Sequence, residues 1–192
     1  MFKKLIFTFL LITSFTLSQS KWTIDATHSN IKFSIVHLMI SEVEGNFKKF
    51  EGEVLSEKED FTGSKVNFTI EVNSINTDNE MRDNHLKSDD FFSAQKYPTI
   101  KFEGTSFTKI SDKKYKLSGN LTMRDITKPA VMDVTYFGTI KDGRGNLKAG
   151  FKALTSISRK NFGVIWDKLT EAGGVVVSDN VDIVCNIQLR KN

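Results

Sequence analysis

The sequence predicts an all-β protein whose strands form an antiparallel sheet of about eight strands. Apolar and polar residues alternate in about eight segments of the chain, and a period of two is typical of a half-buried strand. Short turns separate most of these segments, as is usual between antiparallel neighbours. The chain contains 16 phenylalanines and only two prolines among its 192 residues, and an aromatic-rich composition of this kind favours strands.

The first of these segments, residues 31–38, shows the alternation most clearly. Ile31, Phe33 and Ile35 share one face of the strand, and His37 continues the same row. An imidazole on an apolar face needs a hydrogen-bond partner or a polar group in a cavity. The predicted strands, in chain order, are residues 31–38, 43–54, 66–72, 100–104, 115–123, 132–140, 147–159 and 175–189.

Glycines mark two further features of the predicted sheet. Gly45 and Gly52 interrupt the second strand, and we expect them to allow a bend or a bulge there. The run Asp-Gly-Arg-Gly-Asn at 142–146 is a glycine-rich hairpin turn between the sixth and seventh strands.

Residues 78–92 break the alternation. They are polar, lack a period of two and offer Asp78 as a helix N-cap, so we expect one or two short helical turns here. Phe91, Phe92 and Tyr97 give this segment an apolar underside, which predicts a lid over a sheet edge or a barrel mouth. A second loop, at 161–174, carries a tryptophan.

The first 20 residues have the features of a secretory signal peptide. Two lysines precede an apolar run at 5–17, and Ser18 and Ser20 supply small residues before a cleavage site at Lys21. The run is too short to span a membrane, which takes roughly 20 apolar residues, and no cysteine follows it for lipid attachment. We therefore expect an exported protein without stable membrane insertion, periplasmic where the cell has an outer membrane and secreted otherwise. Residues 21–192 then form one domain.

Composition limits the partners of this chain. The net charge of +4 falls to +2 when the two signal-peptide lysines are removed, and so small a surplus does not indicate nucleic acid. Cys185 is the only cysteine, so no internal disulfide can form. It falls on the apolar face of the last strand, where we favour a buried small hydrophobe over a redox thiol.

Alternation does not decide whether the sheet is hollow or filled. Closing on itself is the most complete way for eight antiparallel strands to avoid exposed edges. A barrel of this size is filled by its own side chains or holds one ligand. A filled β-sandwich therefore stays open as the alternative.

A series of short motifs follows in order along the chain. They are Trp22-x-Ile24-Asp25-x-x-His28-Ser29, Ile31-x-Phe33-x-Ile35-x-His37-Leu38, Val43-x-Gly45-x-Phe47-x-x-Phe50-x-Gly52, Arg82-Asp83-x-His85-Leu86-Lys87-Ser88, Tyr97-Pro98-x-Ile100-x-Phe102, Ile126-Thr127-Lys128-Pro129 and Ile157-x-Arg159-x-x-Phe162-Gly163. Together they resemble the YceI-like family of exported lipid-binding proteins, over essentially the whole chain after residue 21. Asp125 departs from that pattern, because family members usually carry glycine there. If the position requires a positive φ, aspartate tolerates it better than most residues.

The resemblance implies an extended, lipocalin-like antiparallel β-barrel of eight strands, with a short helical segment near residues 78–92. It implies a long apolar channel for an amphiphile with a polyisoprenoid or similar chain, such as a quinone precursor, for carriage, storage or sequestration. It also makes a homodimer the assembly to test. It brings no catalytic group, cofactor or metal site, so the bound lipid is the only ligand that it implies.

Inward-facing side chains are the candidates for the channel wall, because a polyprenyl tail offers almost nothing to hydrogen-bond. Ordinary core packing is the competing interpretation for each of them. The candidates are Ile31, Phe33, Ile35, His37, Phe68, Ile70, Phe102, Leu121, Tyr136, Phe151 and Ile183. The three aromatic residues of the lid are the candidates for the mouth. Arg159 is a candidate for contact with an anionic head group, or for an ion pair with Asp25 or Asp167.

Two other functions compete with lipid binding. His28, His37 and His85 are the only histidines, and three histidines can hold zinc or iron in an enzyme. However, no two of them have the close spacing of ligands on one strand or helix. No serine sits in a Gly-x-Ser-x-Gly turn, and we expect no catalytic activity. A ligand-free structural domain is the second alternative.

Overall fold

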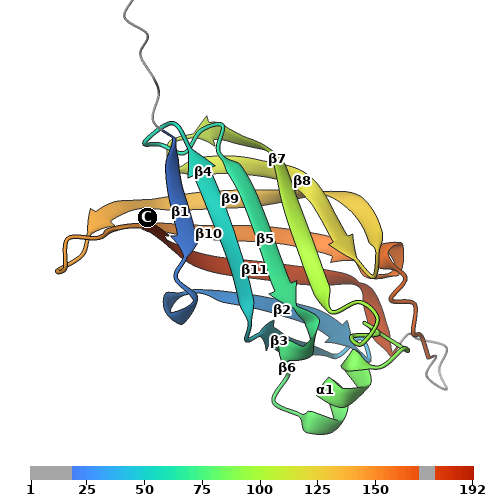
Figure 1. Cartoon of the computed structure of the whole chain (residues 1–192). Helices are drawn as coiled ribbons and strands as arrows, with labels where there is room; N and C mark the ends of the chain where they lie inside the picture. The colour runs from blue at the N-terminus through green and yellow to red at the C-terminus, as the bar shows by residue number, and fades with distance from the viewer. Residues whose placement is uncertain (1–18, 169–175) are drawn as a thin grey trace, which may run out of the picture.

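One antiparallel sheet, closed into a barrel, makes up most of the chain (Figure 1). The computed structural model describes residues 19–168 and 176–192. The predicted signal peptide at 1–20 lies outside the described residues except for its last two positions, and part of the predicted loop at 161–174 also lies outside them. Within the described ranges, eleven strands form a single sheet that closes where β1 pairs with β11.

The elements follow one another along the chain with few helical interruptions. The strands are β1 (Ser20–Ile24), β2 (Asn30–His37), β3 (Ser41–Phe47), β4 (Phe50–Ser56), β5 (Lys65–Glu71), β6 (Ile75–Asn76), β7 (Thr99–Ser111), β8 (Lys114–Met123), β9 (Ile126–Lys141), β10 (Leu147–Ser158) and β11 (Val177–Lys191). The helical elements are α1 (Glu80–Lys87) and three short 3-10 turns, η1 (Ala26–His28), η2 (Val72–Ser74) and η3 (Lys160–Phe162).

The eleven strands form an eight-stranded barrel because three of its strands are interrupted. β1 and β2 lie end to end along the same side of β11, which pairs with both. On the other side, β1 pairs with β4 and β2 pairs with β3. β4 then pairs with β5, and β3 pairs with β6. Each of these pairs of segments therefore acts as one strand. The predicted all-β, eight-stranded antiparallel barrel is confirmed.

Several strands are longer than the alternation predicts. β7 continues past Gly104 to Ser111, a stretch in which Phe107 is the only buried residue. β9 begins at Ile126 rather than at Met132. Pro129 lies in this early part of β9, which pairs with β8, whereas pairing with β10 starts only at Asp133. A residue without an N–H group is tolerated where one side of the strand is unpaired.

The bend in the second predicted strand is not at its glycines. It falls at residues 48–49, between β3 and β4. Gly45 and Gly52 instead allow close packing of aromatic rings inside the barrel. A Cβ atom on Gly45 would lie 2.3 Å from Cζ of Phe33, and one on Gly52 would lie 2.8 Å from Cδ1 of Phe68. Each glycine thus leaves room for a ring from the neighbouring strand.

The predicted helical segment is present, but its N-cap is one residue later than predicted. The side chain of Asn79 accepts a hydrogen bond from the backbone N–H of Arg82 at 3.0 Å, so Asn79 caps α1. Asp78 has a positive φ of 56° and accepts a hydrogen bond from Asn76 at 2.8 Å. Because aspartate and asparagine cap helices equally well, the sequence alone does not choose between the two positions.

The departure from the family pattern at Asp125 lies in a strained turn. Arg124 and Asp125, between β8 and β9, have φ values of 51° and 58°. The position therefore requires a positive φ, and aspartate replaces glycine there with a tolerated left-handed conformation.

Asp25 ties the break between β1 and β2 to the neighbouring strands. Its carboxylate accepts hydrogen bonds from Lys148 Nζ at 2.8 Å, Thr27 Oγ1 at 2.7 Å and Gln188 Nε2 at 3.2 Å. The side chains of Asp25 and Lys148 are only 16% and 15% exposed. Hydrogen bonds from Lys148 and Thr27 hold the pKa of Asp25 well below its usual range.

The variant Asp25→Asn is expected to lower the free energy of unfolding by about 2 kcal/mol at pH 7, since hydrogen bonds to charged groups contribute about 1.5–3 kcal/mol. The folded-state pKa lies below the unfolded-state value of about 3.9. The stabilisation is therefore complete above that value and is lost as the pH falls toward the folded-state pKa. Urea unfolding at pH 7 and at pH 2 should show a difference between wild type and variant that shrinks on acidification. A difference that stays constant would contradict this account of Asp25.

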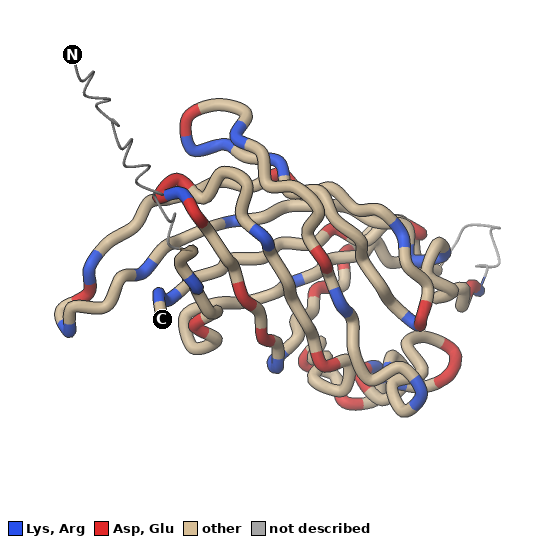
Figure 2. The backbone as a smooth tube through the Cα atoms, turned by 45° about the horizontal axis from the view of Figure 1, so that its top comes forward, with Lys and Arg blue, Asp and Glu red and all other residues tan. Residues whose placement is uncertain are grey.

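Charged residues are spread over the outer wall of the barrel. In the view of Figure 2, basic and acidic residues are interspersed along the strands and turns. This distribution agrees with the small net charge of the sequence. Among the described residues, α1 is far short of membrane-spanning length and no other helix has the required length and hydropathy.

Candidate functional site

The barrel encloses a cavity of about 630 Å³, within the range of ligand pockets. Most of its lining side chains are aliphatic or aromatic and come from nearly all the strands. The basic and imidazole side chains that line it are those of Lys32, His37, Arg82, His85 and Arg159. No aspartate or glutamate among the described residues lines the cavity. The site is thus an apolar chamber without a negative charge in its wall.

Incomplete burial of inward-facing residues shows that the barrel is hollow. Phe33, Ile35, Phe68, Ile70 and Ile183 all line the cavity, yet each is only half-buried. In a filled core these side chains would pack against the opposite wall and lose nearly all their exposure. The filled β-sandwich is therefore excluded.

Phe61 closes one end of the cavity, which we call the closed end. It lies in the loop between β4 and β5, is 1% exposed and packs its ring 5.1 Å from those of Trp22 and Phe151. Its φ of 63° is rare for a bulky residue. The backbone is held in this conformation by neighbours, since Tyr115 Oη donates to the carbonyl of Asp60 at 2.8 Å.

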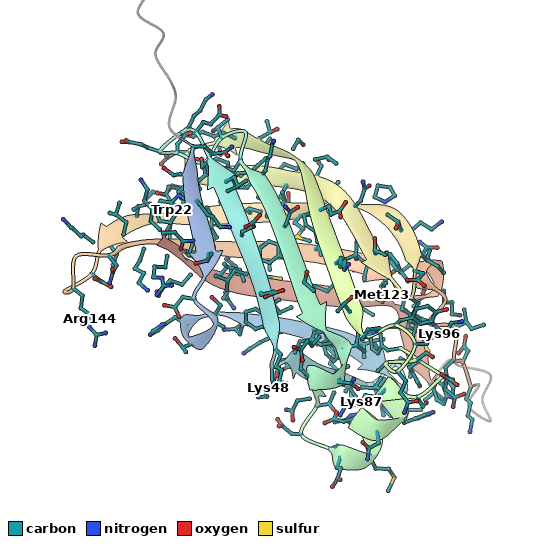
Figure 3. All side chains as sticks on the ribbon, viewed as in Figure 1. Trp22, Lys48, Lys87, Lys96, Met123 and Arg144 are labelled. Atoms are coloured by element: carbon teal, nitrogen blue, oxygen red, sulfur yellow. The ribbon has the colours of Figure 1, made fainter. Side chains whose placement is uncertain are left out.

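The other end of the cavity, which we call the mouth, lies between α1, the β2–β3 turn and the segment after β10 (Figure 1). Phe91 packs its ring 5.2 Å from that of Trp166 and 5.0 Å from that of His85, and Phe92 lies 6.3 Å from Phe47. These rings form an aromatic cover beside the opening. Figure 3 labels Lys87 and Lys96 at this end of the barrel and Arg144 at the opposite end.

Most of the predicted channel residues line the cavity. They are Ile31, Phe33, Ile35, His37, Phe68, Ile70, Phe102, Leu121, Phe151 and Ile183, together with Phe91 and Phe92 of the predicted lid. That these residues contact a ligand stays a prediction.

Two predicted residues do not line the cavity. Tyr136 packs behind the closed end, with its ring 5.0 Å from that of Phe151 and its hydroxyl 2.7 Å from that of Thr139. Tyr97 lies under Lys96 and Arg124, whose cationic groups sit over its ring. The alternation of β9 suggested that Tyr136 faces the cavity, but Phe61 and Phe151 pack against it at the closed end. Tyr97 was predicted from its position near Phe91 and Phe92.

Arg159 forms neither of the predicted ion pairs. Asp25 pairs with Lys148 at 2.8 Å and Asp167 with Lys160 at 2.6 Å. Arg159 is 4% exposed and instead donates to backbone carbonyls. Its acceptors are the carbonyl oxygens of Ser178 at 2.8 Å, Val164 at 2.8 Å, Trp166 at 2.7 Å and Val177 at 3.2 Å. Burial lowers the pKa of Arg159, although an arginine stays charged at neutral pH.

The three histidines lie on three different elements. His28 is in η1 and lies 3.1 Å from Asp25, His37 ends β2, and His85 is in α1 and lies 2.8 Å from Asp90. Among the residues that the structure describes, no three histidine, cysteine, aspartate or glutamate side chains gather as metal ligands. The arrangement gives the metalloenzyme alternative no support.

Cys185 forms part of the cavity wall. Its apolar surroundings raise the pKa of its thiol to about 12, so the reactive thiolate is disfavoured. This environment agrees with a small hydrophobic residue rather than a redox thiol.

Sequence reasoning missed two residues that shape the ends of the cavity. Phe61 closes the far end, and Trp166 covers the mouth. Phe61 is a lone aromatic residue in a polar stretch outside the alternating segments, whereas Trp166 follows the apolar pair Val164-Ile165 in a predicted loop. An isolated aromatic residue in a polar stretch is the signal that could have identified Phe61.

A closed eight-stranded antiparallel barrel around an apolar cavity defines a lipocalin-like, ligand-binding class of protein. The model of the YceI-like domain family matches residues 22–189, and this chain belongs to that family. It is 38% identical over 163 residues to a UPF0312 protein of Staphylococcus aureus strain N315, covering 84% of this chain and 92% of that protein.

Two solved structures share the fold. The YCEI protein of Campylobacter jejuni matches with a TM-score of 0.71 and 33% identity, over 82% of this chain and 90% of that one. A polyisoprenoid binding domain from Saccharophagus degradans matches with a TM-score of 0.63 and 14% identity, over 89% of this chain and 98% of that one.

Proposed function

We propose that this protein is exported and binds one long-chain amphiphile, a polyisoprenoid, a quinone precursor or a similar lipid, inside its barrel. Carriage, storage or sequestration of that lipid, rather than catalysis, is the function. The observation that carries the proposal is the cavity itself, whose wall is mostly apolar between the mouth and Phe61 and contains no carboxylate among the described residues. An isoprenoid chain has no polar group along its length, so a wall of this kind matches it.

Apolar burial supplies the affinity for such a tail. Each buried CH₂ contributes about 0.8 kcal/mol, so a five-carbon isoprene unit contributes roughly 3–4 kcal/mol. Several units would exceed the practical affinity limit of roughly 20 kcal/mol, so ordering of the tail and desolvation of the head group must offset part of the gain. Selectivity therefore follows chain length and shape, with the tail directed toward Phe61.

The head group belongs at the mouth in this proposal. His37, Arg82 and His85 supply polar atoms to the cavity wall there. Arg159 uses four of its five N–H groups on backbone carbonyls, which leaves one for a head group. The Saccharophagus degradans polyisoprenoid binding domain has the same barrel architecture, and this shared fold is its only support for the proposed ligand class.

Titration with a fluorescent polyprenyl analogue tests the proposal. We expect saturable binding of one analogue per barrel, with competition by unlabelled polyprenols that strengthens with chain length and then levels off. A protein that is folded and lipid-free but binds neither the analogue nor any unlabelled long-chain lipid would contradict it. Stoichiometric zinc or iron in protein purified without a polyhistidine tag would favour the metalloenzyme instead.

The double variant Phe91→Ala, Phe92→Ala is expected to speed ligand release by about tenfold, because it removes two rings that cover the mouth. A tenfold faster release corresponds to a barrier to dissociation that is lower by about 1.4 kcal/mol. The dissociation rate is measured by displacement of the fluorescent analogue in a stopped-flow instrument. Phe137→Ala, at a ring that is 61% exposed, is the matched control. Unchanged release kinetics in the double variant would show that these rings are not a lid.

A further inference from the structure

The turn between β2 and β3 holds three large apolar side chains in solvent. Leu38, Met39 and Ile40 are 40%, 70% and 87% exposed. Leu38 and Met39 have φ values of 52° and 62°, and the N–H of Ile40 donates to the carbonyl of His37 at 3.2 Å. A two-residue turn with both central residues left-handed usually carries Asn-Gly, because most other residues are strained there. None of these three side chains lines the cavity, so packing inside the barrel does not offset the strain of the turn.

Two more exposed apolar residues lie at the same end of the barrel. Met81 of α1 is 84% exposed and also lines the cavity. Ile165 is 67% exposed and stands between Val164 and Trp166, which both line the cavity. We call Leu38, Met39, Ile40, Met81 and Ile165 the apolar rim. Met81 lines the cavity, Leu38 and Ile165 adjoin lining residues in sequence, and Met39 and Ile40 complete the turn that follows the lining residue His37. The rim therefore continues the apolar wall of the cavity out to the surface.

We propose that the apolar rim inserts into the surface of a lipid bilayer and opens the mouth of the cavity toward the membrane. This inference rests on the proposed function, since it places the mouth at the source of the lipid. A polyprenyl tail that moves from a bilayer directly into the cavity never exposes its length to water, which would cost about 0.8 kcal/mol per CH₂. Strain stored in a turn that presents apolar side chains at such a site is typical of a functional segment.

The shape and charge of the rim favour a bilayer over a protein partner. The rim consists of side chains at the tips of three separate segments, whereas a stable protein interface needs about 800 Å² of contiguous surface on each partner. Single apolar side chains insert readily into the boundary between lipid head groups and acyl chains. Glu42 and Glu44 follow the β2–β3 turn and Glu80 precedes Met81, whereas Arg82 follows Met81 and Lys87 and Lys96 lie at the same end of the barrel (Figure 3). The charge around the rim is therefore mixed, and the affinity comes from the apolar side chains rather than from attraction to anionic lipids.

The test is flotation of the purified protein with phosphatidylcholine vesicles that contain no polyprenyl lipid. We expect the wild-type protein to float with the vesicles, and added phosphatidylglycerol to bring no increase. The double variant Leu38→Asn, Met39→Gly should lower the partition coefficient about tenfold or more, since it removes two inserting side chains. The same variant should unfold at an equal or higher urea concentration, because Asn-Gly relieves the turn. Ile110→Ser and Ile140→Ser, at exposed residues of the closed end, are the matched controls and should float like the wild type.

Titration of each protein with the fluorescent polyprenyl analogue, without vesicles, separates the two proposals. Loss of flotation with unchanged binding of the analogue would support the apolar rim as the membrane contact. A wild type that binds the analogue but does not float would overturn this inference and leave the proposed function standing. A variant that floats like the wild type would overturn it as well. If the protein does not float and the double variant converts a dimer into a monomer in light scattering, the rim contacts a second copy of the chain, and the inference is wrong.

Discussion

The variant Ile35→Asp is expected to weaken binding of a fluorescent polyprenyl analogue by at least about 100-fold. Ile35 lies on β2 between its partners Val43 and Val181, and all three line the cavity. A carboxylate there would have an apolar cross-strand neighbour on each side. Once a ligand excludes water, an unpaired polar group costs about 2–7 kcal/mol, and each 1.4 kcal/mol is a tenfold loss of affinity. The side chain is half-buried in the empty barrel, so water can hydrate the carboxylate without ligand and the fold should tolerate it.

The neighbouring residue supplies the matched control for this variant. Ser34 is adjacent to Ile35 on the same strand and points to the opposite face. Ser34→Asp adds the same charge to β2 but should leave the dissociation constant of the analogue unchanged. If Ile35→Asp is folded by circular dichroism and binds with unchanged affinity, the assigned channel-facing side of β2 is wrong.

The variant Arg159→Met is expected to lower the free energy of unfolding by about 3–5 kcal/mol. It removes the donor from four backbone carbonyls, two in the segment that follows β10 and two at the start of β11. A buried acceptor left without a donor costs about 1–3 kcal/mol, and part of this cost is relieved where the segment relaxes toward water. Urea unfolding at pH 7 measures the loss.

Arg159→Lys separates the structural role of this residue from a role in ligand binding. Lysine keeps the charge but cannot reach four carbonyls with the planar fork of an arginine, so we expect an intermediate loss of stability. If Arg159 acts only by stabilising the fold, the free energy of unfolding and the affinity for the analogue fall together in both variants. A lysine variant of wild-type stability that loses affinity only for analogues with anionic head groups would identify Arg159 as a head-group contact instead.

Strand alternation identified most of the barrel from sequence, because each long strand has one face toward the cavity. The segment that contains Ile31, Phe33 and Ile35 is the clearest case. The short elements β1 and β6 were not predicted, since five and two residues carry too little alternation to recognise. Their strand conformation is imposed by pairing with residues that are distant along the chain, as for Trp22 opposite Lys191.

The lining of the site could be predicted for the same reason, but its two ends could not. Alternation gives the direction of a side chain and not its depth along the barrel. Tyr136 therefore has the inward phase of a lining residue but lies behind Phe61 and Phe151 at the closed end. Phe61 itself comes from a loop and reaches the barrel interior through a left-handed backbone conformation. Loops that close a barrel carry no periodicity, so only the structure locates them.

Native mass spectrometry of the protein, purified gently from its own host, tests most directly whether the barrel carries a lipid. The account predicts one bound apolar molecule of defined mass per barrel, released by organic solvent and absent from the Ile35→Asp variant. Protein that arrives empty, and that stays empty after incubation with polyprenols of several lengths, would contradict it.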